Sequence, residues 1–194
     1  PPPPTFFYHA HPATPDSSTS RGLGDVYKRQ CYRNIKSKEK YPLIYLSPRG
    51  KPLTQKKVVK LSKMKGINLL CGRYEGIDQR LLDYYTIEEL SIGDYILAGG
   101  ELAAQVLVES IVRLLPGTLG HRESSEMESF NNDLLEYPQY TRPKTWKNMT
   151  IPDVLLSGNH KNISKWRQDM SEKITKKMRP DIWKNYKKNK TSKK

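Results

Sequence analysis

The stretch Ser91–Glu101, SIGDYILAGGE, contains three glycines, Gly93, Gly99 and Gly100, among apolar and aromatic residues. A polar surface loop would not carry so many apolar side chains. A central strand would not carry so many glycines, because glycine weakens strand interiors. The stretch therefore predicts a buried loop whose backbone comes close to another group, an approach that glycine permits. A tight interior turn and a ligand cradle both fit this pattern.

The residues that follow this stretch predict a helix. Residues 102–115, LAAQVLVESIVRLL, are apolar nearly all round a helical projection, and Pro116-Gly117 comes directly after them. A helix that is apolar on all sides is expected to be buried. A glycine-rich loop that leads into a buried helix is a possible ligand cradle.

Two apolar runs earlier in the chain have the length of strands. LIYLS at 43–47 is followed by a turn signal, Pro48-Arg49-Gly50, and INLLC occupies 67–71. Between them, Thr54 predicts the cap of a helix that runs to about Lys65. A short helix, DQRLLDYY, and a third strand or strand and loop, IEELSIGDYIL, come next. This alternation predicts an α/β domain with a mostly parallel sheet covered on both faces.

Three loops, YLSPRG, CGRYEG and SIGDYILAGGE, stand at the carboxyl ends of predicted strands. Parallel sheets bind ligands beyond these ends, so the convergence of three loops favours a ligand site there. None of the loops matches the G-x-G-x-x-G or phosphate-loop pattern, so a Rossmann dinucleotide site or a nucleoside triphosphate site is not supported.

The positive charge of the chain is concentrated at one end. The net charge is +14, and residues 160–194 hold thirteen basic against three acidic side chains, a net of +10. Such a segment indicates binding to a polyanion, most simply nucleic acid through its phosphates. A solvated tail that aids solubility is the simpler alternative.

Cysteine usage and hydropathy set further bounds on the class of protein. Cys31 and Cys71 form no C-x-x-C pair, and with four scattered histidines they offer no metal-ligand spacing. Nothing indicates a disulfide framework, so a reducing cytoplasm is the expected compartment. No apolar run approaches the ~20 residues that a membrane-spanning helix needs.

The two ends of the chain differ from its middle. Residues 1–30 are rich in Pro, Ser, Thr and Gly, and we interpret them as a disordered or non-native leader outside the fold. Residues 118–150 are polar and predict a functional or flexible linker. Residues 151–194 predict a basic helical module, in which Asn159 or Asn162 caps a first helix and Met178-Arg179-Pro180 separates it from a second.

Six motifs, in this order and spacing, resemble the bacterial tRNA (guanine-N1)-methyltransferase family, TrmD: YLSPRG, LLCGRYEGIDQR, SIGDYILAGGE, PGTLGH, LLEYPQYTRP and VLLSGNH. The resemblance covers roughly residues 41–190. The family's N-terminal GGGPGM-type loop is absent, so the chain looks like an N-terminally truncated member with an unrelated leader. The resemblance implies a SPOUT-type parallel sheet with a C-terminal trefoil knot at 31–117, an interdomain linker at 118–150 and a helical tRNA-binding domain at 151–194.

The resemblance also implies the cofactor and the reaction. The family transfers a methyl group from S-adenosyl-L-methionine to N1 of the guanosine immediately 3′ of the tRNA anticodon. It binds this cofactor in the knot loops, largely through backbone groups. By motif match, the cofactor-binding residues are Leu46, Ser47, Pro48, Gly72, Tyr74, Glu75, Ile92, Gly93, Asp94, Tyr95, Ile96, Leu97, Gly99 and Gly100.

Two residues match the family's catalytic positions. Glu128, in EMESF, stands where the family has an Asp that removes the N1 proton; Glu is one methylene longer and has the same chemistry. Arg113 matches an arginine that polarises guanine O6. Without the family match, Glu128 reads as one of five acids of a solvated linker and Arg113 as a helix C-terminal cap. His121 and Ser129 are weaker candidates.

The implied partners are tRNA and a second copy of the chain. The residues expected to hold tRNA are Tyr140, Arg142, His160, Lys165 and Arg167. The family is a homodimer in which the linker of one subunit and the knot of the other share an active site. Two alternatives stay open at this point: a catalytically inactive knotted RNA-binding fragment, and a SPOUT enzyme that methylates ribose 2′-hydroxyls, against which GRYEGID and YTRP argue.

Overall fold

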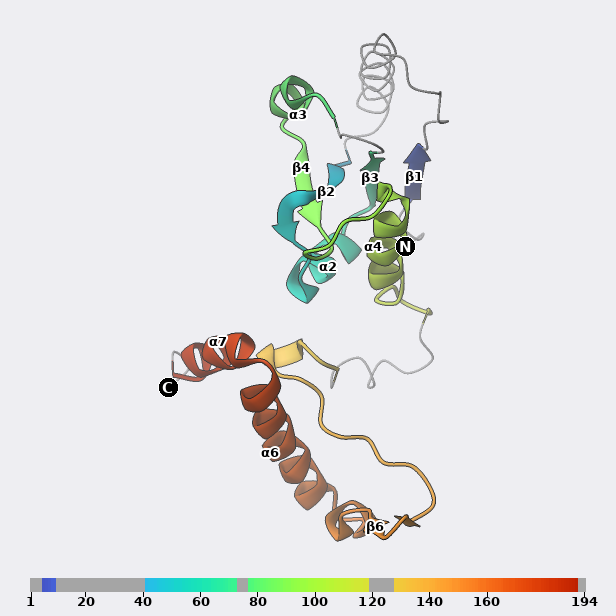
Figure 1. The fold of residues 1–194 in the computed structure, drawn as a ribbon. Helices are drawn as coiled ribbons and strands as arrows, with labels where there is room; N and C mark the ends of the chain where they lie inside the picture. Colours follow the sequence, from blue (N-terminus) through green and yellow to red (C-terminus); the bar gives the residue numbers. More distant parts are fainter. Residues whose placement is uncertain (1–4, 10–40, 73–76, 119–127, 192–194) are drawn as a thin grey trace. The chain divides into compact units, whose positions relative to one another are not determined.

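The computed structural model describes residues 5–9, 41–72, 77–118 and 128–191 (Figure 1). The chain divides into two compact units, Pro1–Gly120 and His121–Lys194. Each unit is described by itself below.

The first unit contains a four-stranded sheet in which all the neighbouring strands run parallel. The strand order is β1-β3-β2-β4, so β3 and β2 are central. The strands are β1 (Thr5–His9), β2 (Leu43–Pro52), β3 (Gly66–Cys71) and β4 (Glu88–Ser91). The helices of this unit are α2 (Gln55–Ser62), α3 (Gln79–Tyr85) and α4 (Gly100–Val112). The predicted α/β class with a parallel sheet is confirmed.

Strand β1 corrects the interpretation of residues 1–30 as a leader outside the fold. Thr5–His9 pairs with β3 in register, from Thr5 opposite Gly66 to His9 opposite Leu70. The sequence TFFYH has the aromatic and β-branched composition that strands favour. Its partner strand lies about sixty residues later in the chain, so no local pattern announces the pairing. The rest of residues 1–30 lies outside the described residues.

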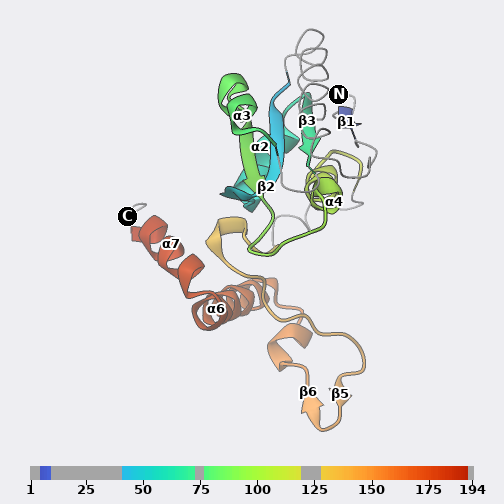
Figure 2. The ribbon, with the colours of Figure 1, turned by 45° about the horizontal axis from the view of Figure 1, so that its top comes forward.

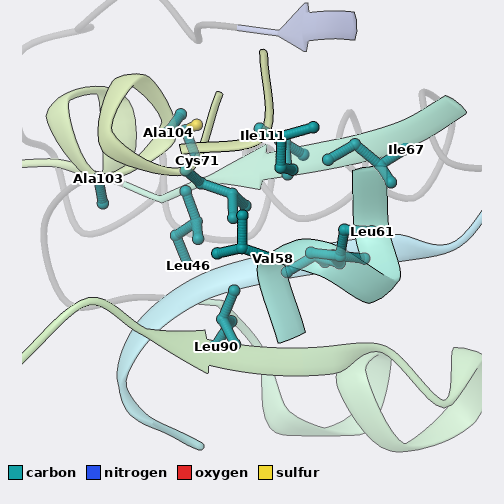
Figure 3. Close-up of a cluster of buried hydrophobic side chains, with 12 residues drawn as sticks. Leu46, Val58, Leu61, Ile67, Cys71, Leu90, Ala103, Ala104 and Ile111 are labelled. Carbon is teal, nitrogen blue, oxygen red and sulfur yellow. The ribbon is translucent and has the colours of Figure 1, made fainter. Parts of the chain in front are cut away.

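The helices that begin after β2 and β4 cover one face of the sheet (Figure 3). Val58 and Leu61 of α2 and Leu107 of α4 pack in one cluster with apolar residues of β2, β3 and β4. Adjacent residues of β2, Ile44 and Tyr45, are both buried although their side chains point to opposite faces. Both faces of this central strand are therefore covered, as predicted.

Helix α4 is less buried than its sequence predicts. Ala103, Leu107 and Ile111 face the sheet, but Leu102 is 58% exposed and Val106 is 46% exposed. The helix ends at Val112, three residues before the predicted end. The sequence of α4 is apolar on all sides, yet only one side of the helix packs against other described residues of this unit.

Helix caps agree with the predictions. The Thr54 hydroxyl accepts a hydrogen bond from the Lys57 amide at 3.3 Å, which fixes the start of α2. The helix ends at Ser62, three residues before the predicted end at Lys65. Asp78 caps α3 by accepting from the Arg80 amide at 2.9 Å.

The second unit is mostly helical. It contains a two-stranded antiparallel sheet of β5 (Thr145–Trp146) and β6 (Met149–Thr150), whose strands lie side by side in Figure 2. The helical elements are the short η1 (Asn131–Asp133) and η2 (Asp153–Leu156) and the long α6 (His160–Met178) and α7 (Pro180–Thr191). Asn159 caps α6 by accepting from the Asn162 amide at 3.1 Å, and the chain breaks at Arg179 as predicted.

The polar stretch before these helices packs on them, and here the structure differs from the predicted interdomain linker at 118–150. Leu134 is buried, and the Leu135 amide donates to the Thr175 hydroxyl of α6 at 2.8 Å. Asp133 accepts a hydrogen bond from Asn189 of α7 at 2.6 Å. These contacts, one from a backbone amide and one to a side-chain carboxylate, show that residues 133–135 pack as part of the second unit.

Among the described residues, no helix is both long enough and apolar enough to cross a membrane.

Candidate functional site

The carboxyl ends of β2, β3 and β4 meet at one edge of the sheet. These strands are neighbours and run parallel, so the segments that leave them start from the same edge. This is the arrangement that the three loops predicted. The loop after β3 is described only at Gly72, Ile77 and Asp78, so Tyr74 and Glu75 lie outside the described residues, as does His121.

Two glycines join the end of β3 to the start of α4 through their backbones. The Gly100 amide, at the start of α4, donates to the Gly72 carbonyl after β3 at 2.9 Å. A Cβ at Gly100 would lie 3.0 Å from Cys71 Cα and 3.2 Å from the Gly72 amide nitrogen. The lack of a side chain at Gly100 therefore permits α4 to begin directly against the end of β3.

The end of β2 bulges toward β4. Leu46 and Lys51 both pair with Leu90, so four residues of β2 form an irregular excursion between them. A Cβ at Gly50 would lie 2.3 Å from the Leu90 amide nitrogen. The predicted turn at Pro48-Arg49-Gly50 is thus a bulge inside a longer strand, because β2 resumes its pairing with β4 at Lys51 and Pro52.

The predicted residues of this bulge would contact a ligand mainly through their backbone. Leu46 is buried and its side chain belongs to the hydrophobic cluster of Figure 3. Ser47 is also buried, and its hydroxyl accepts from the Arg49 amide at 3.3 Å. Tyr45 lies beneath the next loop, with its hydroxyl 3.0 Å from where a Cβ of Gly72 would stand. Burial raises the pKa of Tyr45, and the charge of Glu89 raises it further.

The loop Ser91–Gly99 is anchored at its ends and exposed in the middle. The Ser91 hydroxyl accepts from the Gly93 amide at 3.2 Å and donates to the Gly93 carbonyl at 3.1 Å. Ile92 and Leu97 pack against the hydrophobic cluster. Ile96, between these anchors, is 80% exposed. The prediction of a buried loop is therefore wrong for Asp94 to Ile96, although it holds for the anchoring residues.

Gly93 adopts a backbone conformation that other residues rarely adopt, with φ at +153°. A Cβ there would lie 2.5 Å from Cε1 of Tyr95, whose ring folds back beside it. Gly93 therefore meets the predicted need for glycine in this loop on both conformational and steric grounds.

Arg49 of the β2 bulge contacts both α3 and β4, a role that the sequence did not predict. Its guanidinium donates to Gln79 Oε1 of α3 at 2.9 Å and to Glu89 Oε2 of β4 at 3.3 Å. Arg49 is largely exposed, so this ion pair contributes little to stability. Its geometric effect is to hold the bulge of β2 beside β4 and the start of α3. In the sequence, the only signal for this role of Arg49 is its position directly after Ser47-Pro48 at the end of a predicted strand.

Cys71 ends β3 next to Gly72 and is a buried free thiol. Burial, with a smaller contribution from the charge of Glu101, raises its pKa from 9.0 to about 11. A thiol that stays protonated is a poor nucleophile. Cys71 is thus a packing residue of this edge.

The two predicted catalytic residues belong to different units. Arg113 follows the last turn of α4, is half-buried, and its amide donates to the Glu109 carbonyl at 3.2 Å. Glu128 is half-buried at the start of the described part of the second unit. Beside it, the Ser129 hydroxyl accepts from the Glu136 amide at 3.0 Å.

The residues predicted to hold RNA all lie in the second unit. Tyr140 is exposed and its ring lies 6.2 Å from that of Trp166. Arg167 is half-buried, with its guanidinium 4.7 Å from the centre of the Tyr137 ring, so part of its interaction holds the unit together. Arg142, His160 and Lys165 are exposed, and His160 begins α6.

Comparison with known proteins identifies the family. The sequence model of the tRNA (guanine-1)-methyltransferase family, TrmD, matches residues 6–185. A tRNA (guanine-N(1)-)-methyltransferase from Ruegeria sp. strain TM1040 is 56% identical over 146 residues, which cover 75% of this chain and 60% of the relative. The protein of the same name from Pelagibacter ubique is 50% identical over 184 residues, covering 92% of this chain and 80% of the relative.

The fold is that of an α/β protein with a parallel sheet, and the matches make the chain a member of the TrmD family. The chain spans 60% of the length of the Ruegeria relative. The family match begins at residue 6, so the interpretation of residues 1–30 as unrelated to the family is wrong from that residue onward.

Proposed function

We propose that this chain transfers a methyl group from S-adenosyl-L-methionine to N1 of the guanosine immediately 3′ of the anticodon in tRNA. The observation that carries the proposal is the convergence of three strand ends, one of them joined to the start of α4 through glycine backbones, in a chain of this family. The curated relatives bear the name of this activity.

The cofactor site is proposed at the edge formed by β2, β3 and β4. The residues that would hold the cofactor are the bulge at Leu46 to Pro48, Gly72, and the loop from Ile92 to Leu97 with Gly99 and Gly100. Gly93 and Gly100 support this proposal, because side chains there would overlap Tyr95 and the end of β3 and so displace the segments that form this edge. The bound cofactor supplies an electrophilic methyl group on a sulfonium. We further propose that these segments form the trefoil knot of the SPOUT fold.

Proton removal is proposed for Glu128. Guanine N1 carries a proton at neutral pH, so a base must accept it while the nitrogen attacks the methyl carbon. The Glu128 carboxylate would accept that proton. The Arg113 guanidinium would donate to O6, where negative charge builds up as the proton leaves. The methyl–sulfur bond breaks as the methyl–nitrogen bond forms.

A homodimer would bring the two catalytic residues to one site. Arg113 and Glu128 belong to different units of the chain, and in the proposed dimer each active site takes one from each subunit. The exposed apolar side chains of α4, Leu102 and Val106, suit a protein interface in this first unit. Replacement of Leu102 by Glu should convert the dimer into monomers in sedimentation experiments and abolish transfer. A monomeric wild-type chain with full activity would contradict this arrangement.

Binding of tRNA is proposed for the second unit. Arg142, His160 and Lys165 are exposed there and the C-terminal 35 residues carry a net charge of +10. This charge would bind phosphates and make affinity fall steeply with salt. A tRNA substrate also implies that the protein acts in the cytoplasm.

The test is transfer of a labelled methyl group from S-adenosyl-L-methionine to two tRNA transcripts that differ only in G or A immediately 3′ of the anticodon. We expect label on the G transcript alone. Label on both transcripts would redirect the proposal to another nucleotide or to the ribose. Absence of label on both, with tRNA and cofactor bound, would contradict the proposed activity.

A further inference from the structure

The β5–β6 hairpin, residues 144–151, is the most exposed ordered element of the second unit. Every residue from Thr141 to Thr150 is exposed. Trp146 and Met149 face each other across the two strands and are 58% and 59% exposed. An isolated two-stranded hairpin is marginally stable in water, and such apolar side chains are normally buried. Packing within the described residues of the unit therefore does not account for this pair.

Trp146 differs in this respect from the other two tryptophans of the chain. Trp183 is half-buried and stacks on Tyr186, with ring centres 5.3 Å apart. The Tyr186 hydroxyl in turn donates to Glu172 Oε1 of α6 at 2.6 Å, a bond that lowers the pKa of Glu172. Trp166 is half-buried beside Tyr140. These rings hold the helices of the unit together, whereas Trp146 does not.

The charged residues within the hairpin and its flanks, 137–152, are all basic. Residues 137–152 contain three cations, Arg142, Lys144 and Lys147, and no acid. The Lys147 ammonium lies 4.9 Å from the centre of the Trp146 ring, and Lys144 pairs with Asp153 at 3.6 Å. The surface that the hairpin presents is therefore an aromatic ring with cations beside it, which is complementary to a nucleobase and its phosphates.

The turn holds Lys147 in a costly conformation. Lys147 and Asn148 both have positive φ, 47° and 63°, the backbone of a two-residue hairpin turn that favours Asn-Gly. Asn tolerates this conformation, but Lys does so less readily. This conformation places the Lys147 side chain over the Trp146 ring. The strained residue is therefore also the one that carries the cation.

We propose that the β5–β6 hairpin is a stacking contact for an unpaired base of the tRNA anticodon loop, with Trp146 against the base and Lys147 at a neighbouring phosphate. The inference rests on the proposed function, which gives the partner. Proteins recognise single-stranded loops of RNA by stacking splayed bases on aromatic rings, and lysines neutralise the adjoining phosphates. The hairpin adds a base contact to a unit whose other candidates, Arg142, His160 and Lys165, suit phosphates.

Binding of the full chain to a fluorescein-labelled tRNA transcript, without cofactor, tests the proposal. We expect Trp146→Leu to weaken binding about 10-fold, because it keeps an apolar side chain but removes the stacking ring. Trp146→Phe should keep most of the affinity. It should also lose the RNA-induced quenching of tryptophan fluorescence that stacking on Trp146 produces.

The variant Lys147→Gly is expected to weaken tRNA binding without lowering the stability of the protein. Glycine suits a positive φ, so this variant should melt no lower than the wild type. It should nevertheless bind more weakly and reduce the slope of log affinity against log salt by about 1. Lys63→Ala, an equal loss of charge at an exposed residue after α2, is the matched control and should leave affinity unchanged.

Wild-type affinity in folded Trp146→Leu would overturn the proposal, and so would unchanged quenching in Trp146→Phe. The Trp146→Leu protein is also tested for binding to phosphatidylserine vesicles. If it loses vesicle binding but keeps tRNA binding, the hairpin contacts a membrane, and the proposal is overturned. The measurement is independent of turnover. A wild-type chain that binds tRNA through Trp146 but transfers no methyl group would contradict the proposed activity and leave this contact intact.

Discussion

Replacement of Gly50 by Ala tests whether the bulge of β2 requires direct backbone contact with β4. A Cβ at Gly50 would lie 2.3 Å from the Leu90 amide nitrogen, 2.5 Å from the Glu89 carbonyl carbon and 2.6 Å from the Leu90 carbonyl carbon. All three are backbone atoms, so no change of rotamer relieves the overlap. The bulge and β4 must therefore move apart by about 1 Å to reach ordinary contact distances.

The cost of this movement follows from the contacts it disturbs. Overpacking of a well-packed site costs about 1–3 kcal/mol. The nearby hydrogen bond from the Leu53 amide to the Ser91 carbonyl, 2.7 Å long, would be stretched or lost, at about 1 kcal/mol. Alanine also lowers the conformational entropy of the unfolded chain, which raises the free energy of unfolding by about 0.4–1 kcal/mol. The overlap dominates, and we expect the free energy of unfolding to fall by about 2–3 kcal/mol.

Urea unfolding followed by far-ultraviolet circular dichroism measures this change. All three tryptophans lie in the second unit, so tryptophan fluorescence would not report it. Gly117→Ala is the matched control, because φ there is +86° and no atom lies within 4 Å of the added Cβ. The Gly117→Ala variant should lower the free energy of unfolding only through the unfavourable positive φ of alanine, by about 1–2 kcal/mol. A Gly50→Ala protein as stable as the wild type, with unchanged amide exchange at Leu53, would refute the close-contact argument.

Three further predictions concern the proposed site. Glu128→Gln should bind S-adenosyl-L-methionine like the wild type in calorimetry but transfer methyl groups at least about 100-fold more slowly, because the amide cannot accept the N1 proton; near-full activity would remove Glu128 from the mechanism. Gly93→Val should abolish cofactor binding while the chain stays folded, because valine disfavours the backbone at φ +153° and would overlap Tyr95; calorimetry showing unchanged affinity would make the loop structural only. The raised pKa of Cys71, about 11 against 9.0, makes its contribution to stability complete below pH 9.0 and lost as pH rises through about 11. Urea titrations should therefore show a smaller loss over this range for Cys71→Ala, and parallel losses in both proteins would disprove the assignment.

Most elements of the fold could be predicted because their signals are local. The Thr54 and Asn159 caps accept the amide hydrogen bonds that their positions require, and both start helices in the structure. Strand β1 could not be predicted in this way. Its five residues lie among prolines and polar residues, and a parallel partner sixty residues away leaves no trace in local periodicity.

The candidate site was predictable to a similar degree. Glycine marks places where the backbone comes close to other groups: Gly100 approaches the end of β3, and Gly93 approaches the Tyr95 ring of its own loop. The exposure of Ile96 was not predictable, because composition shows that a residue is apolar but does not show what covers it. The role of Arg49 was also hidden, since its partners Gln79 and Glu89 are thirty and forty residues away.

The charges of the loop Ser91–Glu101 and of residues 160–194 are consistent with the two ligands that the proposed reaction brings together. A sulfonium cofactor carries a positive charge, which nearby acids would attract. The loop Ser91–Glu101 contains two acids, Asp94 and Glu101, and no basic residue. A tRNA is a polyanion and needs the reverse, which residues 160–194 supply with a net charge of +10. One uniformly basic surface would serve the RNA but weaken cofactor binding. In the proposed arrangement the loop Ser91–Glu101 would bind the cofactor without opposing basic side chains of its own, and residues 160–194 would bind the phosphates.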